Sequence, residues 1–267
     1  MKAYLSFFKI WVLSGLQYRA AAYAGIATQF AFGFMTILMF NAFYTGNPDG
    51  FPMSFPQLSA YVWLQQALLT LYMAWFFDHE IFGSISNGNV AYDLCRPVGI
   101  YEMWFVRSVA SRVYRVLLRC APILIVAALL PAPYGLMPPV NAAAFGWFVL
   151  SMLLGLLIMV SINMLIYISA FYTVSSLGIR ILSTSVIEFL SGAVIPIPFM
   201  PEGVQRVLNL LPFASTQNTP FLIYNGFVSG SELYFSLLAQ LAWLVILFLT
   251  GKLLIRNALK RVVVQGG

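Results

Sequence analysis

The stretch from Cys120 to Ile179 contains no charged side chain, and no other feature of the sequence limits the possible folds so strongly. A helix that spans a bilayer needs about 20 apolar residues, so this stretch alone has room for two. Across all 267 residues only 8% are charged and 61% are hydrophobic, whereas soluble domains carry about 25% charged residues. Helices satisfy their own backbone hydrogen bonds in lipid. We therefore expect an all-α integral membrane protein.

Six apolar runs are separated by turn-forming residues or charges, and each is a candidate transmembrane helix. The runs cover approximately Ala20–Tyr44, Gln57–Phe77, Tyr114–Leu130, Ala142–Tyr172, Ile181–Ile197 and Leu233–Leu254. We interpret residues 1–267 as a single transmembrane domain, with six spans in 20–254 and a cytoplasmic tail in 255–267.

Residues 1–19 are predicted to form a helix in the membrane interface. Lys2, Ser6 and Lys9 share one face and aromatic residues cover most of the rest, a pattern that suits an interfacial helix. Lys9 interrupts the apolar run that a signal peptide would need. A simple extension of the first span is the alternative.

The distribution of Lys and Arg predicts the orientation, because cytoplasmic segments of membrane proteins are enriched in both. With the N-terminus inside, every Lys and Arg except Arg206 falls on the cytoplasmic side. The net charge of +6 is therefore explained by topology and does not indicate a nucleic-acid partner. Cys95 and Cys120 also fall on the cytoplasmic side, where a structural disulfide is not expected.

Motifs for catalysis are absent from the sequence. No segment fits GxxxxGK[ST], so the chain has no phosphate-cradling loop of its own. His79 is the only histidine, and Asp78, His79 and Glu80 point in different directions if they are helical, which favours a polar cap on the second span over a metal site. We predict no enzyme activity, no metal and no cofactor bound by this chain.

The loop Asp78–Pro97 is predicted to lie on the cytoplasmic side between the second and third spans. It contains a short amphipathic piece bounded by Gly83 and Gly88 and a second piece that ends at Pro97. Such a loop can dock on a soluble partner, although an ordinary connecting loop fits the pattern too.

The segment 196–213 is predicted to form an outer re-entrant hairpin before the last span. Pro196, Pro198 and Pro201 end the fifth span early, and the apolar spacing after them predicts a short amphipathic helix. Irregular backbone at membrane depth has to be buried in protein or line a cavity, so the hairpin could close a translocation path. A surface loop with one interfacial helix is the alternative.

Charged residues within the spans are candidates for function, because a charge at mid-bilayer costs about 2.5–3.5 kcal/mol on insertion scales. Glu188 is the only acidic residue in mid-span; it could bind a cationic substrate, pair with a basic group, or be protonated and structural. Arg112, Arg115 and Arg119 share a helical face, where they could hold lipid headgroups, bind partner carboxylates or snorkel to the interface.

Two short motifs resemble those of the ABC-2 type membrane subunits of ATP-binding-cassette transporters. Ile85-Ser86-Asn87-Gly88 with Leu94-Cys95-Arg96-Pro97 is similar to the "I-x-x-G … L-x-R-P" pattern of a bacterial exporter branch, and 220–226 resembles the "P … G" step before the last span. The resemblance extends over nearly the whole chain through the order of its elements.

The resemblance implies a permease subunit in the bacterial cytoplasmic (inner) membrane that exports a lipophilic or amphipathic compound. It also implies a second permease, of the same or a different chain, and two copies of a separate ABC ATPase that bind ATP and Mg²⁺; both termini are cytoplasmic and membrane lipid surrounds the chain. By the same resemblance, the residues that couple to the ATPase are Glu80, Ile81, Phe82, Ser84, Ile85, Ser86, Asn87 and Arg96. The translocation path or gate would include Glu188, Pro196, Pro198, Phe199, Gln29 and Gln66.

Two other functions remain open. Polar residues within the spans, such as Asn41, Gln65 and Asn163, together with Glu188, are compatible with an ATP-independent carrier or channel subunit. A lipid-modifying membrane enzyme would need a nucleophile and base, and the sequence offers no recognisable pair.

Overall fold

The computed structural model describes residues 2–17, 19–173 and 175–260, and all regular structure in these ranges is helical. The helices are α1 (Lys2–Gly15), α2 (Arg19–Gly46), η1 (Pro48–Gly50), α3 (Phe55–Ala67), α4 (Leu69–Tyr72), α5 (His79–Ser86), α6 (Val90–Leu94), α7 (Ile100–Leu129), α8 (Ala142–Ser169), η2 (Ala170–Tyr172), α9 (Ser176–Leu190), η3 (Ile197–Phe199), α10 (Glu202–Asn209), α11 (Asn218–Tyr224) and α12 (Gly230–Leu259). This confirms the all-α prediction for the described residues.

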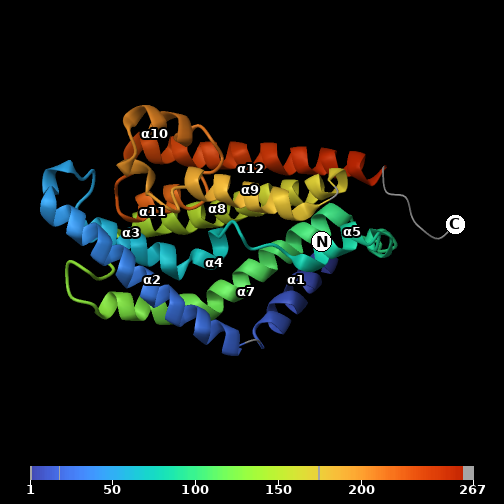
Figure 1. Ribbon diagram of the computed structural model, residues 1–267, viewed down its shortest axis with the longest axis horizontal. Helices are drawn as coiled ribbons and strands as arrows, with labels where there is room; N and C mark the ends of the chain where they lie inside the picture. The colour runs from blue at the N-terminus through green and yellow to red at the C-terminus, as the bar shows by residue number, and fades with distance from the viewer. Residues whose placement is uncertain (1, 18, 174, 261–267) are drawn as a thin grey trace.

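Three helices in the described ranges are long and apolar enough to cross a membrane: Ala22–Gly46, Ala142–Tyr172 and Gly230–Leu259. The central one, α8, has 61% of its most apolar window buried, against 22% for α2 and 17% for α12. α8 therefore forms the centre of the bundle, and α2 and α12 keep broad apolar faces on the outside (Figure 1). These helices support the membrane assignment, while the count of six spans stays a prediction.

The predicted second span is not one continuous helix. α3 ends at Ala67, α4 lasts only to Tyr72, and the chain from Met73 to Asp78 is not helical. The apolar run Gln57–Phe77 predicted a regular helix because apolar composition does not show where a helix is broken, so this prediction is wrong in its second half.

The predicted third span began too late. α7 starts at Ile100, well before the predicted start at Tyr114, and continues for 30 residues. Its arginines suggested a polar loop, but they lie within the helix and several are bound by other elements. The predicted fifth span is also shorter, since α9 ends at Leu190.

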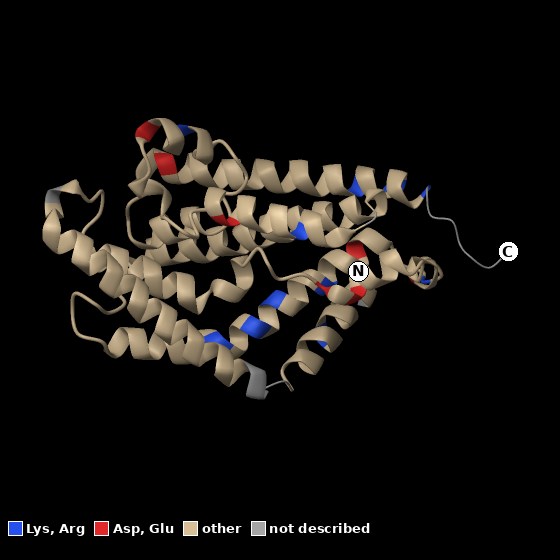
Figure 2. Ribbon diagram, viewed as in Figure 1, with Lys and Arg blue, Asp and Glu red and all other residues tan. Residues whose placement is uncertain are grey.

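The ends of the bundle differ in composition. α1, the α5 region and the end of α12 lie at one end of the long axis, and α10 and α11 lie at the other (Figure 1). Lys and Arg concentrate towards the end that holds α5 (Figure 2). The arrangement fits the predicted orientation, in which that end faces the cytoplasm.

The segment before the last helix matches the predicted elements. η3 begins directly after Pro196 and contains Pro198, and α10 covers Glu202–Asn209 directly after Pro201. Leu208 of α10 packs in a small separate core with Ile197 and Met200. The short amphipathic helix is therefore present where it was expected, while its re-entry into a membrane stays a prediction.

Candidate functional site

The loop after the second predicted span forms two short helices. Asp78 caps the first of them, because its Oδ1 accepts a hydrogen bond from the Glu80 amide at 3.0 Å, which satisfies one of the free N–H groups of the first turn. The chain turns at Gly88, whose φ of +73° lies in the left-handed region that favours glycine. The triplet Asp78-His79-Glu80 thus begins α5, and the expectation that it caps the second span is wrong.

Arg107 on α7 fastens the start of α5 to the bundle. Its Nε lies 2.5 Å from Asp78 Oδ2, its Nη2 lies 2.9 Å from Asp78 Oδ1, and Nη2 also pairs with Glu80. The same guanidinium lies 4.1 Å from the ring centroid of Trp11 on α1, a distance at which a cation is attracted to an aromatic face. Arg107 therefore joins α1, α5 and α7.

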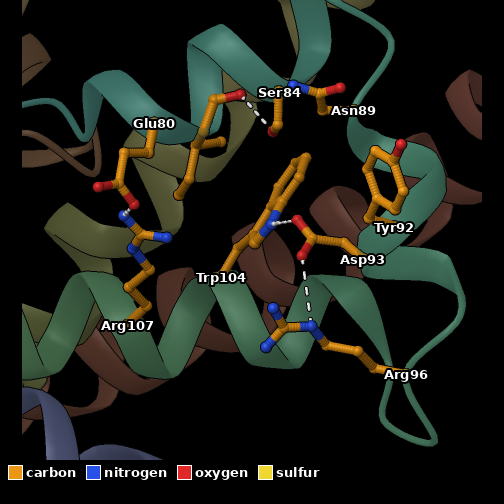
Figure 3. A pocket seen from close by; sticks show the side chains of 9 residues that line it. Glu80, Ser84, Asn89, Tyr92, Asp93, Arg96, Trp104 and Arg107 are labelled. Atoms are coloured by element: carbon orange, nitrogen blue, oxygen red, sulfur yellow. Dashed lines mark hydrogen bonds and ion pairs between the residues drawn. The ribbon is translucent and has the colours of Figure 1, made fainter.

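A pocket of about 280 Å³ opens between α5, α6 and the start of α7 (Figure 3). Trp104 is almost fully buried at its centre and donates from Nε1 to Asp93 at 3.2 Å. Arg96 lies 3.6 Å from the other oxygen of Asp93. The pocket is lined by Glu80, Ile81, Ser84, Asn89, Tyr92, Asp93, Arg96, Trp104 and Arg107.

The predicted coupling residues divide into an exposed and an inward-facing set. Exposed or half-exposed are Glu80, Ser84, Ile85, Ser86, Asn87 and Arg96. Ile81 and Phe82 are only 1% and 6% exposed, and the Phe82 ring packs edge-on against Tyr167 of α8 at 4.9 Å. Only the first set can touch a partner directly, while the second holds α5 on the bundle.

One more ion pair ties this end of the molecule together. Lys252 of α12 lies 2.5 Å from Glu102 in the first turn of α7. Burial opposes ionisation of Glu102, but the hydrogen bond and charge of Lys252 outweigh it and lower the pKa of the carboxyl below its ordinary value. The pair links the element that follows the loop to the C-terminal helix.

The structure brings together some of the predicted translocation residues. Gln29 of α2 is buried and donates to the Gln66 carbonyl at 2.9 Å, which caps the end of α3. Phe199 contacts the Phe40 and Phe51 rings at 5.6 and 5.3 Å. Both pairs connect α2 to another predicted path element.

The remaining path residues do not join this group by any polar contact. Pro196 and Pro198 are buried in the turn after α9. Glu188 is half-buried on α9, and its Oε1 is buried without a hydrogen-bond partner among the described residues. No hydrogen bond or ion pair in the described ranges joins Glu188 to Gln29 or Gln66, so the predicted path is not one continuous polar cluster.

The sequence did not indicate the role of Arg112. Its side chain is 0% exposed and donates to backbone carbonyls next to the break in the second predicted span, so it is neither a snorkelling residue nor a ligand for partner carboxylates. The one signal for this was that Arg112 has no acidic residue close to it in the chain.

Comparison with known proteins identifies a family over most of the chain. The family described as ABC-2 family transporter protein matches residues 26–266, which includes α3 to α12 and about three quarters of α2. A search of curated proteins gives no match. With a match over most of its length and the helices of a membrane protein, this chain belongs to the ABC-2 family of transporter proteins.

Proposed function

We propose that this chain is the permease subunit of an exporter and that a separate ABC ATPase drives it by docking on α5 and the Gly88 turn. Membership of the ABC-2 family supports a permease subunit of a transporter. Export of a lipophilic or amphipathic compound, two ATPase copies and a second permease complete the proposal.

The observation that carries the proposal is that the loop is exposed at its tip and rigidly held at its base. Ser86, Asn87 and Asn89 are exposed, whereas Ile81 is buried and Asp78 is fixed by Arg107. A loop with this construction can receive a force at the tip and pass it to the helices, which a freely hinged loop cannot do.

Affinity purification of the chain from its native membrane in mild detergent tests the partner. We expect a protein with a phosphate-cradling loop to copurify and the complex to hydrolyse ATP. A stable chain that never retains such an ATPase would contradict the proposal.

A matched pair of variants tests the docking site. Asn87→Trp places a bulky ring at the exposed tip, and we expect the amount of bound ATPase to fall at least about tenfold, which corresponds to about 1.4 kcal/mol. Asn209→Trp makes the same change on exposed α10 at the other end of the bundle and should leave binding unchanged. Equal amounts of bound ATPase in both variants would show that α5 and the Gly88 turn are not part of the ATPase interface.

One observation favours a second candidate, an ATP-independent carrier or channel subunit. Glu188 has a buried oxygen that finds no hydrogen-bond partner among the residues that the structure describes, and carboxyls within membrane helices often mark ion or proton pathways. Ion-driven flux through the purified chain alone in liposomes, lost in Glu188→Gln, would support this candidate over the first.

A further inference from the structure

The non-helical segment Met73–Asp78, which we call the strap, connects the interrupted second predicted span to α5. Arg112 of α7 binds the end of α4 and the strap itself. Its Nη1 donates to the carbonyls of Leu71 and Met73 at 2.9 and 3.1 Å, and its Nη2 donates to the carbonyl of Phe76 at 3.3 Å.

Physical chemistry explains why an arginine occupies this position. The last carbonyls of α4 and those of the strap lack helical partners, and an unpaired polar group in an apolar interior costs several kcal/mol. Arg112 lies 17 residues from the outer end of α7 at Leu129, about 26 Å at 1.5 Å per residue, and the hydrocarbon core is about 30 Å thick. With the predicted third span at Tyr114–Leu130, the strap carbonyls lie close to the inner edge of the apolar region, where few water molecules are available to donate hydrogen bonds to them.

In the described part of the chain, the guanidinium of Arg112 binds backbone carbonyls and forms no ion pair with a carboxylate. Its partners are the carbonyl oxygen of Leu71 in α4 and those of Met73 and Phe76 in the strap. These oxygens accept charge-assisted hydrogen bonds from the guanidinium. The planar guanidinium presents several donors in a fixed fork, so one side chain reaches carbonyls on both sides of the break. A lysine has a single nitrogen and cannot span them in the same way.

The strap is held from a second side by α8. Asn163 Nδ2 donates to the Phe76 carbonyl at 3.1 Å, and the Asp78 amide donates to the Tyr167 hydroxyl at 2.7 Å. Asn163 and Tyr167 are one helical turn apart, and on α7 Arg112 and Arg107 are separated by little more. The helix α7 therefore binds both ends of the strap, through Arg112 at Met73 and Arg107 at Asp78. The helix α8 binds its second half, at Phe76 and Asp78.

We propose that Arg112 is a positioning residue for the coupling of ATP hydrolysis to transport. By fixing the strap, it makes α5, α7 and the inner half of α8 move as one body, so that displacement of α5 reaches the outer ends of these helices. Without Arg112 the strap becomes a hinge that absorbs the displacement. This inference rests on the proposed function for the force that acts on α5, while the grip of Arg112 on the strap can be measured without a partner.

The first test uses the chain alone in lipid nanodiscs and measures hydrogen exchange of peptides that cover the strap and α5. We expect Arg112→Met to raise exchange in 73–82 at least about tenfold, because the loss of two or more charge-assisted hydrogen bonds favours local opening. The exchange rate of Arg112→Lys should lie between those of the unaltered chain and Arg112→Met. Arg115→Met is the comparison variant, because Arg115 lies 4.2 Å from the Phe76 ring centroid but donates to no strap carbonyl in the described ranges. Its loss removes one cation–π contact and should raise strap exchange by no more than about fivefold.

The second test uses the complex with its ATPase and follows movement with pairs of spin labels, in a background of Cys95→Ser and Cys120→Ala. One pair, His79→Cys with Leu129→Cys, joins the first turn of α5 to the outer end of α7 and leaves the proposed docking tip unlabelled; the other, Leu129→Cys with Phe235→Cys, joins the outer ends of α7 and α12. All three positions are exposed. On trapping with ATP and vanadate, we expect the first separation to stay constant and the second to shift.

We expect the response of the two label separations to reverse in Arg112→Met, and to a lesser degree in Arg112→Lys. Both variant complexes should still hydrolyse ATP. The α5-to-α7 separation should now shift and the α7-to-α12 separation should stay constant. A general disruption of the fold would not cause one label separation to start shifting and the other to stop.

Three results would overturn the inference in distinguishable ways. Unchanged strap exchange in Arg112→Met would show that Arg112 does not hold the strap. Raised exchange with an unaltered label response would show that the grip is only structural. If no ATPase associates with the unaltered chain, the proposed function fails and the coupling role fails with it, whatever the exchange result.

Discussion

Gln240 of α12 and Ser151 of α8 bind each other in both directions across the centre of the bundle. The Ser151 hydroxyl donates to Gln240 Oε1 at 2.9 Å, and Gln240 Nε2 donates to the Ser151 carbonyl at 3.2 Å. Gln240 also donates to the Ser215 carbonyl at 2.8 Å. Both side chains are fully buried, so this clasp orients α12 on α8 and ties both to the segment before α11.

Replacement of Gln240 by Leu should destabilise the chain by about 1 kcal/mol, since hydrogen bonds between membrane helices are worth about 0.6 kcal/mol on average and up to about 1.7. Thermal unfolding in nanodiscs measures the effect. Ser236→Ala, on the same helix and only partly buried, is the control. Equal midpoints for Gln240→Leu and the unaltered chain would show that the clasp contributes nothing to stability.

Gly155→Ala should be destabilising by about 1–3 kcal/mol, the usual cost of overpacking a core. A Cβ atom at Gly155 would overlap the carbonyl oxygen of Thr216, which is backbone and cannot rotate away. Gly146→Ala is the matched change in the same helix, with open space around the new methyl group. We expect a clearly lower thermal unfolding midpoint for Gly155→Ala than for Gly146→Ala, and equal midpoints would contradict the prediction.

Asp78→Ala should loosen α5 by about 1 kcal/mol, the typical value of a helix N-cap, and should also release Arg107. Limited proteolysis within 83–89 reports the opening of the loop. His79→Ala changes the exposed neighbour and should leave cleavage unaltered. Equal cleavage rates for both variants would mean that the cap and the Arg107 pair do not secure the loop.

Acidification should weaken the Glu102–Lys252 pair. Because the pKa of Glu102 is lowered in the folded chain, its stabilising effect is complete above the unfolded pKa of about 4.3 and is lost as the pH falls through the lower folded value. The melting temperature of the unaltered chain should therefore exceed that of Glu102→Gln at neutral pH and approach it as the pH falls below that value. A constant difference across this range would exclude ionisation of Glu102 as its cause.

Several elements followed from the sequence because their signals are local. The long charge-free run became α8, prolines and apolar spacing predicted α10, and the glycine at position 88 marked the turn between α5 and α6. Of the candidate site residues, Asn87 is exposed at the tip of the loop, and its role in docking stays a prediction. The inward orientation of Ile81 and Phe82 was not predicted, since an amphipathic pattern does not reveal which partner covers its apolar side.

The sequence by itself determined that the chain is a helical membrane protein and how its charges divide between the two ends, because hydropathy and charge act residue by residue. Only the tertiary structure decided where the second predicted span breaks and what secures the break. Gln29 and Arg112 reach that break from helices about 40 residues away in the chain, and no local pattern records such a contact. A buried polar group is stable only if its partner is present in three dimensions, and for the strap that partner comes from another helix.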